Sequence, residues 1–221
     1  DLGLPDPLAK DSIFRIYSMT KPVTGVAMLM LYEEGKWRLD DPVSRYIPEF
    51  AKLVVYVGEN PDGTPRTEPA RRSMTMRELM THTAGLAYGL VGAHPVDKLF
   101  LKANVLDPAE PLSTMIGKIA GLPLLAQPGT RWSYSSGADV QGYLVERLSG
   151  LSFAQFLESR LFAPLGMTAT SHHVESAPAD KRALGYRWED NTWKLEPTMA
   201  HGAFGAMGGM LVGFAVWAYT L

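Results

Sequence analysis

The chain has 221 residues, of which 46% are hydrophobic and 20% are charged, the make-up of an ordinary globular protein long enough to bury a sizeable core. Lysine and arginine number 21 against 23 aspartate and glutamate residues, so charge gives no reason to expect nucleic acid or an anionic membrane as a partner. The chain contains no cysteine, which excludes disulfides, thiolate zinc sites and a cysteine nucleophile.

The two ends of the sequence carry little targeting information. Residues 1–12 show no basic stretch followed by an apolar run, so we expect no signal peptide there, and the cytoplasm is only slightly favoured over other compartments. The C-terminal run GAMGGMLVGFAVWAYTL is shorter than the ~20 residues that a spanning helix needs. Its glycines indicate a buried element, and no membrane anchor is expected.

Residues 12–34 combine the pattern of a short strand with that of a helix. The first part alternates between two faces, as a strand does, and the second part takes helical spacing. Because Pro22 lacks a backbone donor and is tolerated only in a first turn, the helix is predicted to begin close to Ser18. Gly35 is predicted to end it. The expected core-facing positions of this helix are Val23, Val26, Ala27, Met30 and Leu31.

The middle of the chain is predicted to be mostly helical. Capping boxes, in which a Ser or Thr and a Glu or Gln satisfy the backbone of a first helical turn, occur at Thr75 with Glu78 and at Ser152 with Gln155. Between these boxes, residues 137–150 carry apolar side chains at helical spacing. We therefore expect a helix after each box and another between them.

Two stretches are predicted to be non-helical. Residues 58–72 are rich in glycine, proline and charge, which is typical of a surface loop. Residues 183–195 consist of two short strand-like runs around Asp190 and Asn191, a pair of residues that favours a tight turn. The second stretch is therefore expected to form a hairpin.

Ser18 and Lys21 are the first pair of residues suited to chemistry. Their i, i+3 spacing at a helix start places both side chains on one face, with Cβ atoms about 5 to 6 Å apart. A serine hydroxyl needs an adjacent base to act as a nucleophile, and a lysine serves best where burial disfavours its charge. Because the helix is uncharged from Lys21 to Glu33, the lysine is expected to be buried or to line a cleft.

A second candidate site lies in the run PGTRWSYSSG. Its proline and glycine indicate a turn, and Tyr134 lies among serines rather than in an apolar stripe. The alternative interpretation of Tyr134 is a core tyrosine whose hydroxyl is hydrogen-bonded. Trp132, nearby in the same run, is a candidate for the wall of an acyl pocket.

Three stretches between residues 14 and 167 carry sequence motifs of one protein family, in the same order along the chain as in that family. They are FRIYSMTKPVTGVAMLMLYEEGKWRLDDPVSRYIPEF, MTMRELMTHTAGL and QPGTRWSYSSGADVQGYLVERLSGLSFAQFLESRLFAPLGM. Together they resemble the penicillin-recognising serine hydrolases, which comprise class C β-lactamases, DD-peptidases and family VIII carboxylesterases. The resemblance implies that Ser18 is the acylated nucleophile and Lys21 its proton-accepting partner. Tyr134 is then the base that activates the attack and later protonates the leaving group.

Within this family the chain is more similar to the esterases. Members that act on β-lactams or peptides commonly carry an asparagine where this chain has Ser136, and the shorter serine is a poorer partner for an amide. We therefore expect Ser136 and Trp132 to contact substrate, and small carboxylic esters to be cleaved through an acyl-enzyme. No cofactor is expected, and the expected partner is the small ester rather than a nucleic acid or a membrane.

The resemblance also implies an α+β fold of the β-lactamase/transpeptidase type, with an antiparallel sheet flanked by helices. Residues 1–50 and 181–221 are expected to form a partial α/β subdomain that carries the nucleophile helix. Residues 51–180 are expected to form a largely helical subdomain that carries the tyrosine motif. Family members usually continue to a strand with Lys-Thr-Gly, His-x-Gly or Trp-Gly-Gly, which this sequence lacks, so the fold is expected to be truncated at its termini.

Other functions stay open at this point. The same fold would serve a β-lactamase, a DD-peptidase or an acyltransferase, and a catalytically inactive fragment that self-associates through exposed sheet edges is a further alternative. A metal site is not expected, because only the adjacent pair His172 and His173 clusters in the sequence. We interpret His82 as a structural residue of a turn.

Overall fold

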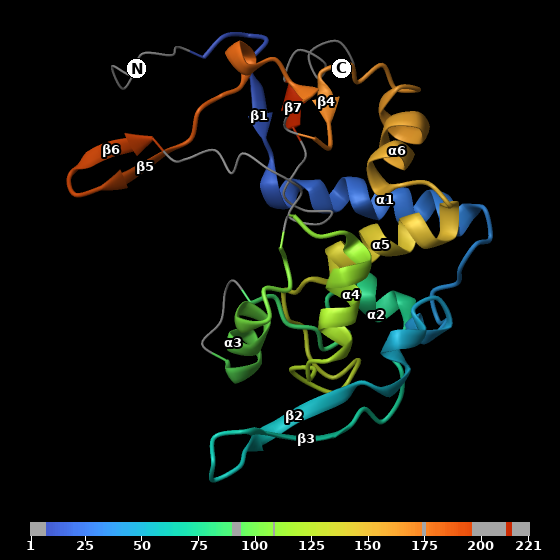
Figure 1. Cartoon of the computed structure of the whole chain (residues 1–221). Helices are drawn as coiled ribbons and strands as arrows, with labels where there is room; N and C mark the ends of the chain where they lie inside the picture. The colour runs from blue at the N-terminus through green and yellow to red at the C-terminus, as the bar shows by residue number, and fades with distance from the viewer. Residues whose placement is uncertain (1–7, 90–93, 108, 174–175, 196–210, 214–221) are drawn as a thin grey trace.

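The computed structural model describes residues 8–89, 94–107, 109–173, 176–195 and 211–213, and Figure 1 shows the order of its elements. The helices are α1 (Thr20–Glu33), α2 (Met76–Met80), α3 (Pro95–Lys102), α4 (Leu112–Ala120), α5 (Gly137–Ser149) and α6 (Phe153–Leu157). The strands are β1 (Ile13–Arg15), β2 (Val54–Glu59), β3 (Pro65–Pro69), β4 (Thr170–Ser171), β5 (Tyr186–Glu189), β6 (Thr192–Leu195) and β7 (Leu211–Gly213).

A small antiparallel sheet joins the two ends of the described chain. Its strand order is β1-β7-β4, with Ile13 opposite Gly213 and Thr170 opposite Val212. In Figure 1 this sheet lies on one side of α1, and the other helices lie mostly on the opposite side. The architecture is thus the α+β type predicted. It differs from the predicted subdomains in that β4 comes from the range 51–180 and still pairs with β7.

The core forms where α1 and α5 pack against each other. Ala27 and Met28 of α1 and Leu144 of α5 have no exposed surface, and a continuous cluster of buried side chains extends from them towards α2 and α4. Trp37 belongs to this cluster, and its indole nitrogen donates to the carbonyl of Met28 over 2.9 Å. The helix that carries Lys21 and directly follows Ser18 is therefore held by the main core of the molecule.

Local sequence signals account for the helix ends. Pro22 lies in the first turn of α1, and Gly35 follows its C-terminal end with a φ of +72°, a conformation that glycine adopts without steric cost. Both predicted capping boxes are present, at the starts of α2 and α6. Because these signals act within one or two turns of the helix, the helix ends can be predicted from the sequence alone.

Of the two predicted non-helical stretches, one is as expected and one differs. Asp190 and Asn191 have φ values of +51° and +60° and join β5 to β6, as a two-residue hairpin turn requires. The predicted surface loop over residues 58–72 instead contains β3, which pairs with β2 in a second hairpin. The side chains of β3 are mostly exposed, which explains why its composition resembles that of a loop.

The buried face of α1 also differs from the predicted one. Val26 was expected in the core, yet it is 42% exposed, while Thr20 and Thr24 are fully buried. The helix is apolar on most of its surface, so spacing alone does not distinguish its inner face. Leu29 and Tyr32 lie on the same exposed side as Val26.

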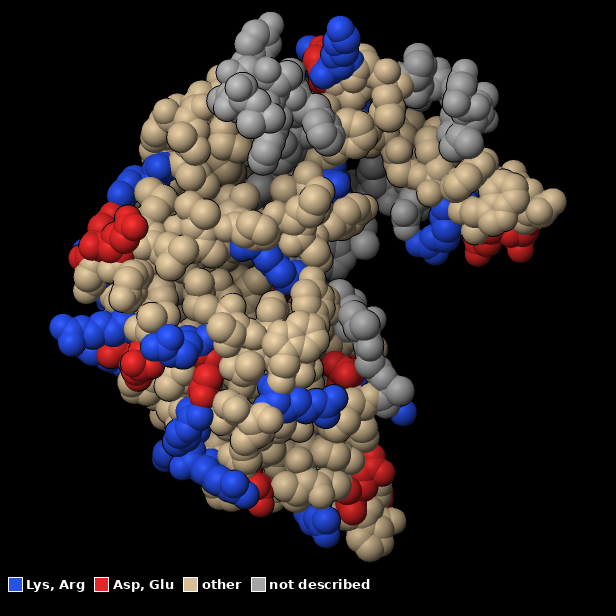
Figure 2. Space-filling model, turned by 180° about the vertical axis from the view of Figure 1, so that it is seen from behind, with Lys and Arg blue, Asp and Glu red and all other residues tan. Residues whose placement is uncertain are grey.

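Charge is dispersed over the surface shown in Figure 2, where lysine and arginine side chains alternate with acidic ones around a large uncharged area. Among the residues that the structure describes, no helix is long and apolar enough to cross a membrane. Most of the apolar run at the C-terminus, apart from residues 211–213 in β7, lies outside the described residues, so its predicted burial stays a prediction.

Candidate active site

Ser18 lies at the junction between β1 and α1. A 3₁₀ turn over Tyr17–Met19 connects the two elements, and α1 begins at Thr20. Tyr17 has a φ of +44°, which is uncommon for a residue other than glycine and costs roughly 1 kcal/mol or more. The turn leaves Ser18 exposed to solvent at the start of the helix, where a nucleophile is accessible to a substrate.

Ser18, Lys21 and Tyr134 form one mutually hydrogen-bonded cluster. The ammonium nitrogen of Lys21 is 3.2 Å from Ser18 Oγ, and the Tyr134 hydroxyl donates to the same Oγ over 2.8 Å. Lys21 Nζ also donates to the Tyr134 hydroxyl. Lys21 and Tyr134 are 113 positions apart in the chain, and both contact the Oγ atom of Ser18.

The cluster has the connectivity that activates a serine. Each of two neighbours, an amine and a phenol, is within reach of the hydroxyl proton of Ser18. The positive charge of Lys21 lies 4.3 Å from the centroid of the Tyr134 ring, so it also stabilises negative charge on that phenol. Lys21 and Tyr134 are both half-buried, which strengthens these interactions relative to bulk water.

Aromatic rings surround the Tyr134 side chain. The ring of His82 lies 5.2 Å from it and that of Tyr88 lies 5.3 Å from it, between centroids. Burial, followed by the nearby negative charge of Asp139, raises the pKa of Tyr88 well above its ordinary value, so this phenol stays neutral. Sequence reasoning missed Tyr88, because it follows the HTAGL segment without a motif of its own.

His82 is a neutral neighbour of the cluster. Burial lowers the pKa of His82 and the nearby charge of Lys21 lowers it further. Its Nδ1 accepts a hydrogen bond from the backbone N–H of Ser135 over 3.3 Å, which places the ring proton on Nε2. Among the described residues no group of histidine, aspartate or glutamate side chains is arranged to hold a metal ion.

The two residues predicted to contact substrate lie in different environments. Trp132 is 62% exposed, with its ring 6.2 Å from that of His82, and it lies in the same segment as Tyr134. Ser136 is fully buried, and its hydroxyl donates to the carbonyl of Ala87 over 3.0 Å. The structure therefore leaves Trp132 accessible to a ligand and places the Ser136 hydroxyl in the core.

A turn supported by an ion pair holds the Tyr134 segment. Arg72 donates to both carboxylate oxygens of Glu78 over 2.8 and 2.5 Å and to the carbonyl of Pro128 over 3.0 Å. Gly129, with a φ of +82°, donates its N–H to Thr83 over 2.8 Å. A Cβ at Gly129 would lie 2.5 Å from Glu78 Oε1, so the turn closes directly onto the ion pair.

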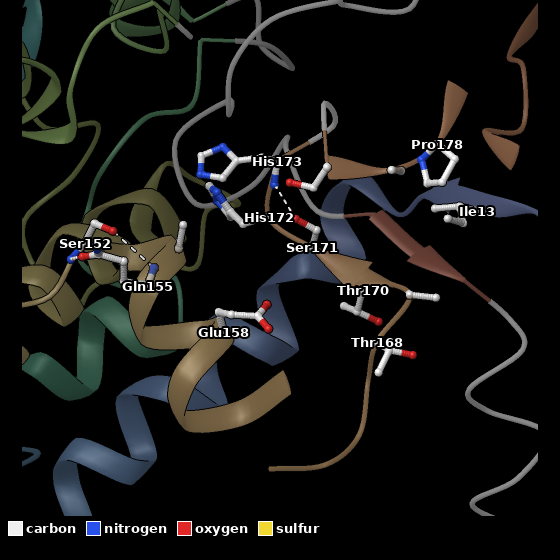
Figure 3. A pocket seen from close by; sticks show the side chains of 14 residues that line it. Ile13, Ser152, Gln155, Glu158, Thr168, Thr170, Ser171, His172, His173 and Pro178 are labelled. Carbon is white, nitrogen blue, oxygen red and sulfur yellow. Dashed lines mark hydrogen bonds between the residues drawn. The ribbon is translucent and has the colours of Figure 1, made fainter. Parts of the chain in front are cut away.

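A separate cavity of about 610 Å³ lies away from this cluster and is drawn in Figure 3. It is lined by parts of α6 and β4 and by the residues around His172 and His173, and none of the three clustered residues lines it. His172 is buried edge-on against Phe153, with ring centroids 5.2 Å apart. Size alone does not indicate a reaction in this cavity, whereas the Ser18 cluster brings a serine hydroxyl within hydrogen-bond distance of an amine and a phenol.

Comparison with known proteins places this chain in a family. The family model described as Beta-lactamase matches residues 1–215. Protein Rv1367c of Mycobacterium tuberculosis is 39% identical over 86% of this chain and 46% of its own length. Lovastatin esterase of Penicillium rubens is 31% identical over 96% of this chain and 55% of its own length.

A solved structure gives the same result for the fold. Unliganded simvastatin synthase (LovD) from Aspergillus terreus, as its selenomethionyl derivative, superposes with a TM-score of 0.80 at 28% identity, over 96% of this chain and 54% of that one. The chain thus spans about half the length of the relatives it matches. The expected β-lactamase/transpeptidase-like fold is confirmed, and the chain belongs to the Beta-lactamase family.

Proposed function

We propose that this chain carries the catalytic core of a serine hydrolase that cleaves small carboxylic esters through an acyl-enzyme on Ser18. The observation that carries the proposal is the convergence of Lys21 Nζ and the Tyr134 hydroxyl on Ser18 Oγ, at 3.2 and 2.8 Å. The relatives support the ester class, since they include lovastatin esterase and an esterase, EstB, of Burkholderia gladioli.

In the proposed reaction, Ser18 Oγ attacks the carbonyl carbon of the ester while its proton passes to a deprotonated neighbour, either the phenolate of Tyr134 or the neutral amine of Lys21. The tetrahedral intermediate collapses by breaking the bond to the alcohol oxygen, and the same group returns the proton to that oxygen. Water then repeats the sequence on the acyl-enzyme: the cluster takes a proton from water, the acid leaves, and Ser18 recovers its hydrogen. Protons and bonds balance over the cycle.

The burial of Ser136 favours esters over β-lactams. Its hydroxyl donates to Ala87, so it is not available to the amide of a β-lactam or a peptide. Trp132 is exposed near the cluster and supplies an apolar surface for an acyl chain.

The proposal is tested with purified chain, p-nitrophenyl butyrate and a chromogenic cephalosporin, each beside Ser18→Ala. We expect ester hydrolysis that disappears in the variant, with a butyryl group attached to Ser18 by peptide mass spectrometry. Hydrolysis that survives in Ser18→Ala would overturn the assignment of the nucleophile. An absence of activity on both substrates from folded chain would favour the catalytically inactive alternative.

Acyl transfer to an alcohol is a second candidate, because monacolin J acid methylbutanoyltransferase of Aspergillus terreus is 34% identical over 78% of this chain. The same acyl-enzyme would pass its acyl group to the alcohol instead of water. Adding increasing amounts of a primary alcohol to the butyrate assay separates the two. Transfer predicts a new butyrate ester in proportion to the alcohol, whereas hydrolysis predicts butyric acid alone.

A further inference from the structure

His82 is distant from the Tyr134 segment in the sequence but lies beside it in the structure. It follows α2 and has a φ of +59°, a left-handed conformation that directs its backbone and ring towards the same segment. Its carbonyl accepts from the N–H of Ser133 over 2.9 Å, and its Nδ1 accepts from the N–H of Ser135 over 3.3 Å. These two hydrogen bonds flank Tyr134 on either side.

The ring of His82 also contacts Tyr134 itself, at 5.2 Å between centroids and an angle of 36°. The Ser135 hydroxyl, 3.1 Å from Nδ1, connects the imidazole to the start of α5 through the N–H of Gly137. His82 thus contacts three consecutive residues: its backbone carbonyl accepts from Ser133, its ring packs against the ring of Tyr134, and its Nδ1 accepts from Ser135.

We propose that His82 is a positioning residue, whose Nδ1, by accepting from Ser135, holds the Tyr134 hydroxyl between Lys21 and Ser18. This inference rests on the proposed function of the Ser18 cluster. The phenol is effective only while it is within hydrogen-bond distance of Ser18 Oγ, and a shift of about 1 Å can lower a rate about 10²-fold. A residue that held the turn only for stability would not affect the rate of the folded enzyme.

Two substitutions separate these roles. His82→Ala removes the acceptor and the ring. His82→Asn restores an acceptor at the position of Nδ1 and tolerates the positive φ, because asparagine is one of the residues that adopt this conformation. We expect His82→Ala to lower kcat for p-nitrophenyl butyrate by about 10²-fold with little change in KM, and His82→Asn to recover most of that loss.

His94 provides a matched control. Its Nδ1 also accepts from a backbone N–H, that of Val96, over 3.2 Å, at the start of α3 and against Tyr56 of β2. His94→Ala therefore removes the same kind of hydrogen bond without contacting the cluster. Once rates are corrected for the folded fraction, we expect kcat of His94→Ala to equal that of the wild type.

A second measurement does not depend on catalysis. Exchange of the Ser135 backbone amide with deuterium, followed by NMR, should be fast in His82→Ala and slow in the wild type and in His82→Asn. Equal exchange in all three, or a kcat in His82→Asn as low as in His82→Ala, would overturn the positioning role. If the wild type hydrolyses no ester, the proposed function fails, and amide exchange alone then decides whether His82 holds this segment.

Discussion

Replacing Tyr134 by phenylalanine removes one oxygen atom from the centre of the proposed catalytic cluster. That oxygen donates to Ser18 Oγ over 2.8 Å and accepts from Lys21 Nζ. The phenyl ring keeps its neighbours, because His82 and Tyr88 lie 5.2 and 5.3 Å from its centroid. The substitution therefore changes proton transfer far more than it changes packing.

The expected magnitudes follow from these contacts. A positioned acid or base contributes about 10²- to 10⁴-fold to a rate, so kcat of Tyr134→Phe for p-nitrophenyl butyrate should fall by that factor. The variant loses two hydrogen bonds at a half-buried site, each with a net value of about 0.5 to 1.5 kcal/mol. The free energy of unfolding should therefore decrease by at most about 1 to 3 kcal/mol.

The assay measures kcat and the urea unfolding of Tyr134→Phe beside a matched control, Tyr46→Phe. The Tyr46 hydroxyl donates to Asp41 Oδ2 over 2.5 Å, and burial, followed by this hydrogen bond, raises the pKa of Tyr46 to about 12. Its removal should lower stability and leave kcat unchanged. A Tyr134→Phe variant that keeps more than about a tenth of the wild-type kcat would refute a proton-transfer role for this hydroxyl.

Three further predictions concern the surroundings of the cluster. Gly129→Ala should lower the free energy of unfolding by about 1 to 3 kcal/mol in urea titrations, because its Cβ would overlap Glu78 and Arg72 at a φ of +82°. Burial alone would raise the pKa of Glu78, but hydrogen bonds from Arg72 and from the start of α2 outweigh it, so the pKa is lowered. The folded form is therefore stabilised above the ordinary pKa of glutamate and loses this stabilisation as pH falls, so Glu78→Gln should lower Tm at pH 7 and have a smaller effect near pH 3. Ser136→Ala removes the hydrogen bond to the carbonyl of Ala87, so the free energy of unfolding measured in urea should fall by about 1 kcal/mol, while KM for the ester stays unchanged.

The helix ends and the hairpin turn of this fold can be predicted from the sequence, because the interactions that form them join residues close together in the chain. The proline in the first turn of α1, the capping boxes at Thr75 and Ser152, and the turn at Asp190 and Asn191 each depend on a few adjacent residues. The Ser18–Lys21 pair belongs to this class, since i, i+3 spacing alone brings the two side chains together.

Burial was harder to predict because it depends on partners that are distant in the chain. Val26 is exposed although it fits the helical spacing, because α1 is apolar on most sides and its inner face is chosen by α5. Ser136 looks like a substrate contact beside Tyr134, yet the backbone of Ala87 takes up its hydroxyl. In both cases the burial of the side chain is set by a residue or helix far away in the sequence: α5 for Val26 and Ala87 for Ser136.

The distance between Ser18 and Tyr134 is set by the packing of two helices. Ser18 precedes α1 and Tyr134 precedes α5. These helices pack against each other, and both contribute fully buried side chains, such as Met28 and Leu144, to one core cluster. Protein interiors are close-packed, so a cavity or an added methylene in this contact is accommodated partly by movement of one helix against the other. Because the phenol reaches Ser18 Oγ over only 2.8 Å, such a movement separates the proton-transfer group from the nucleophile. The same contact that stabilises the fold therefore also sets the geometry on which the proposed chemistry depends.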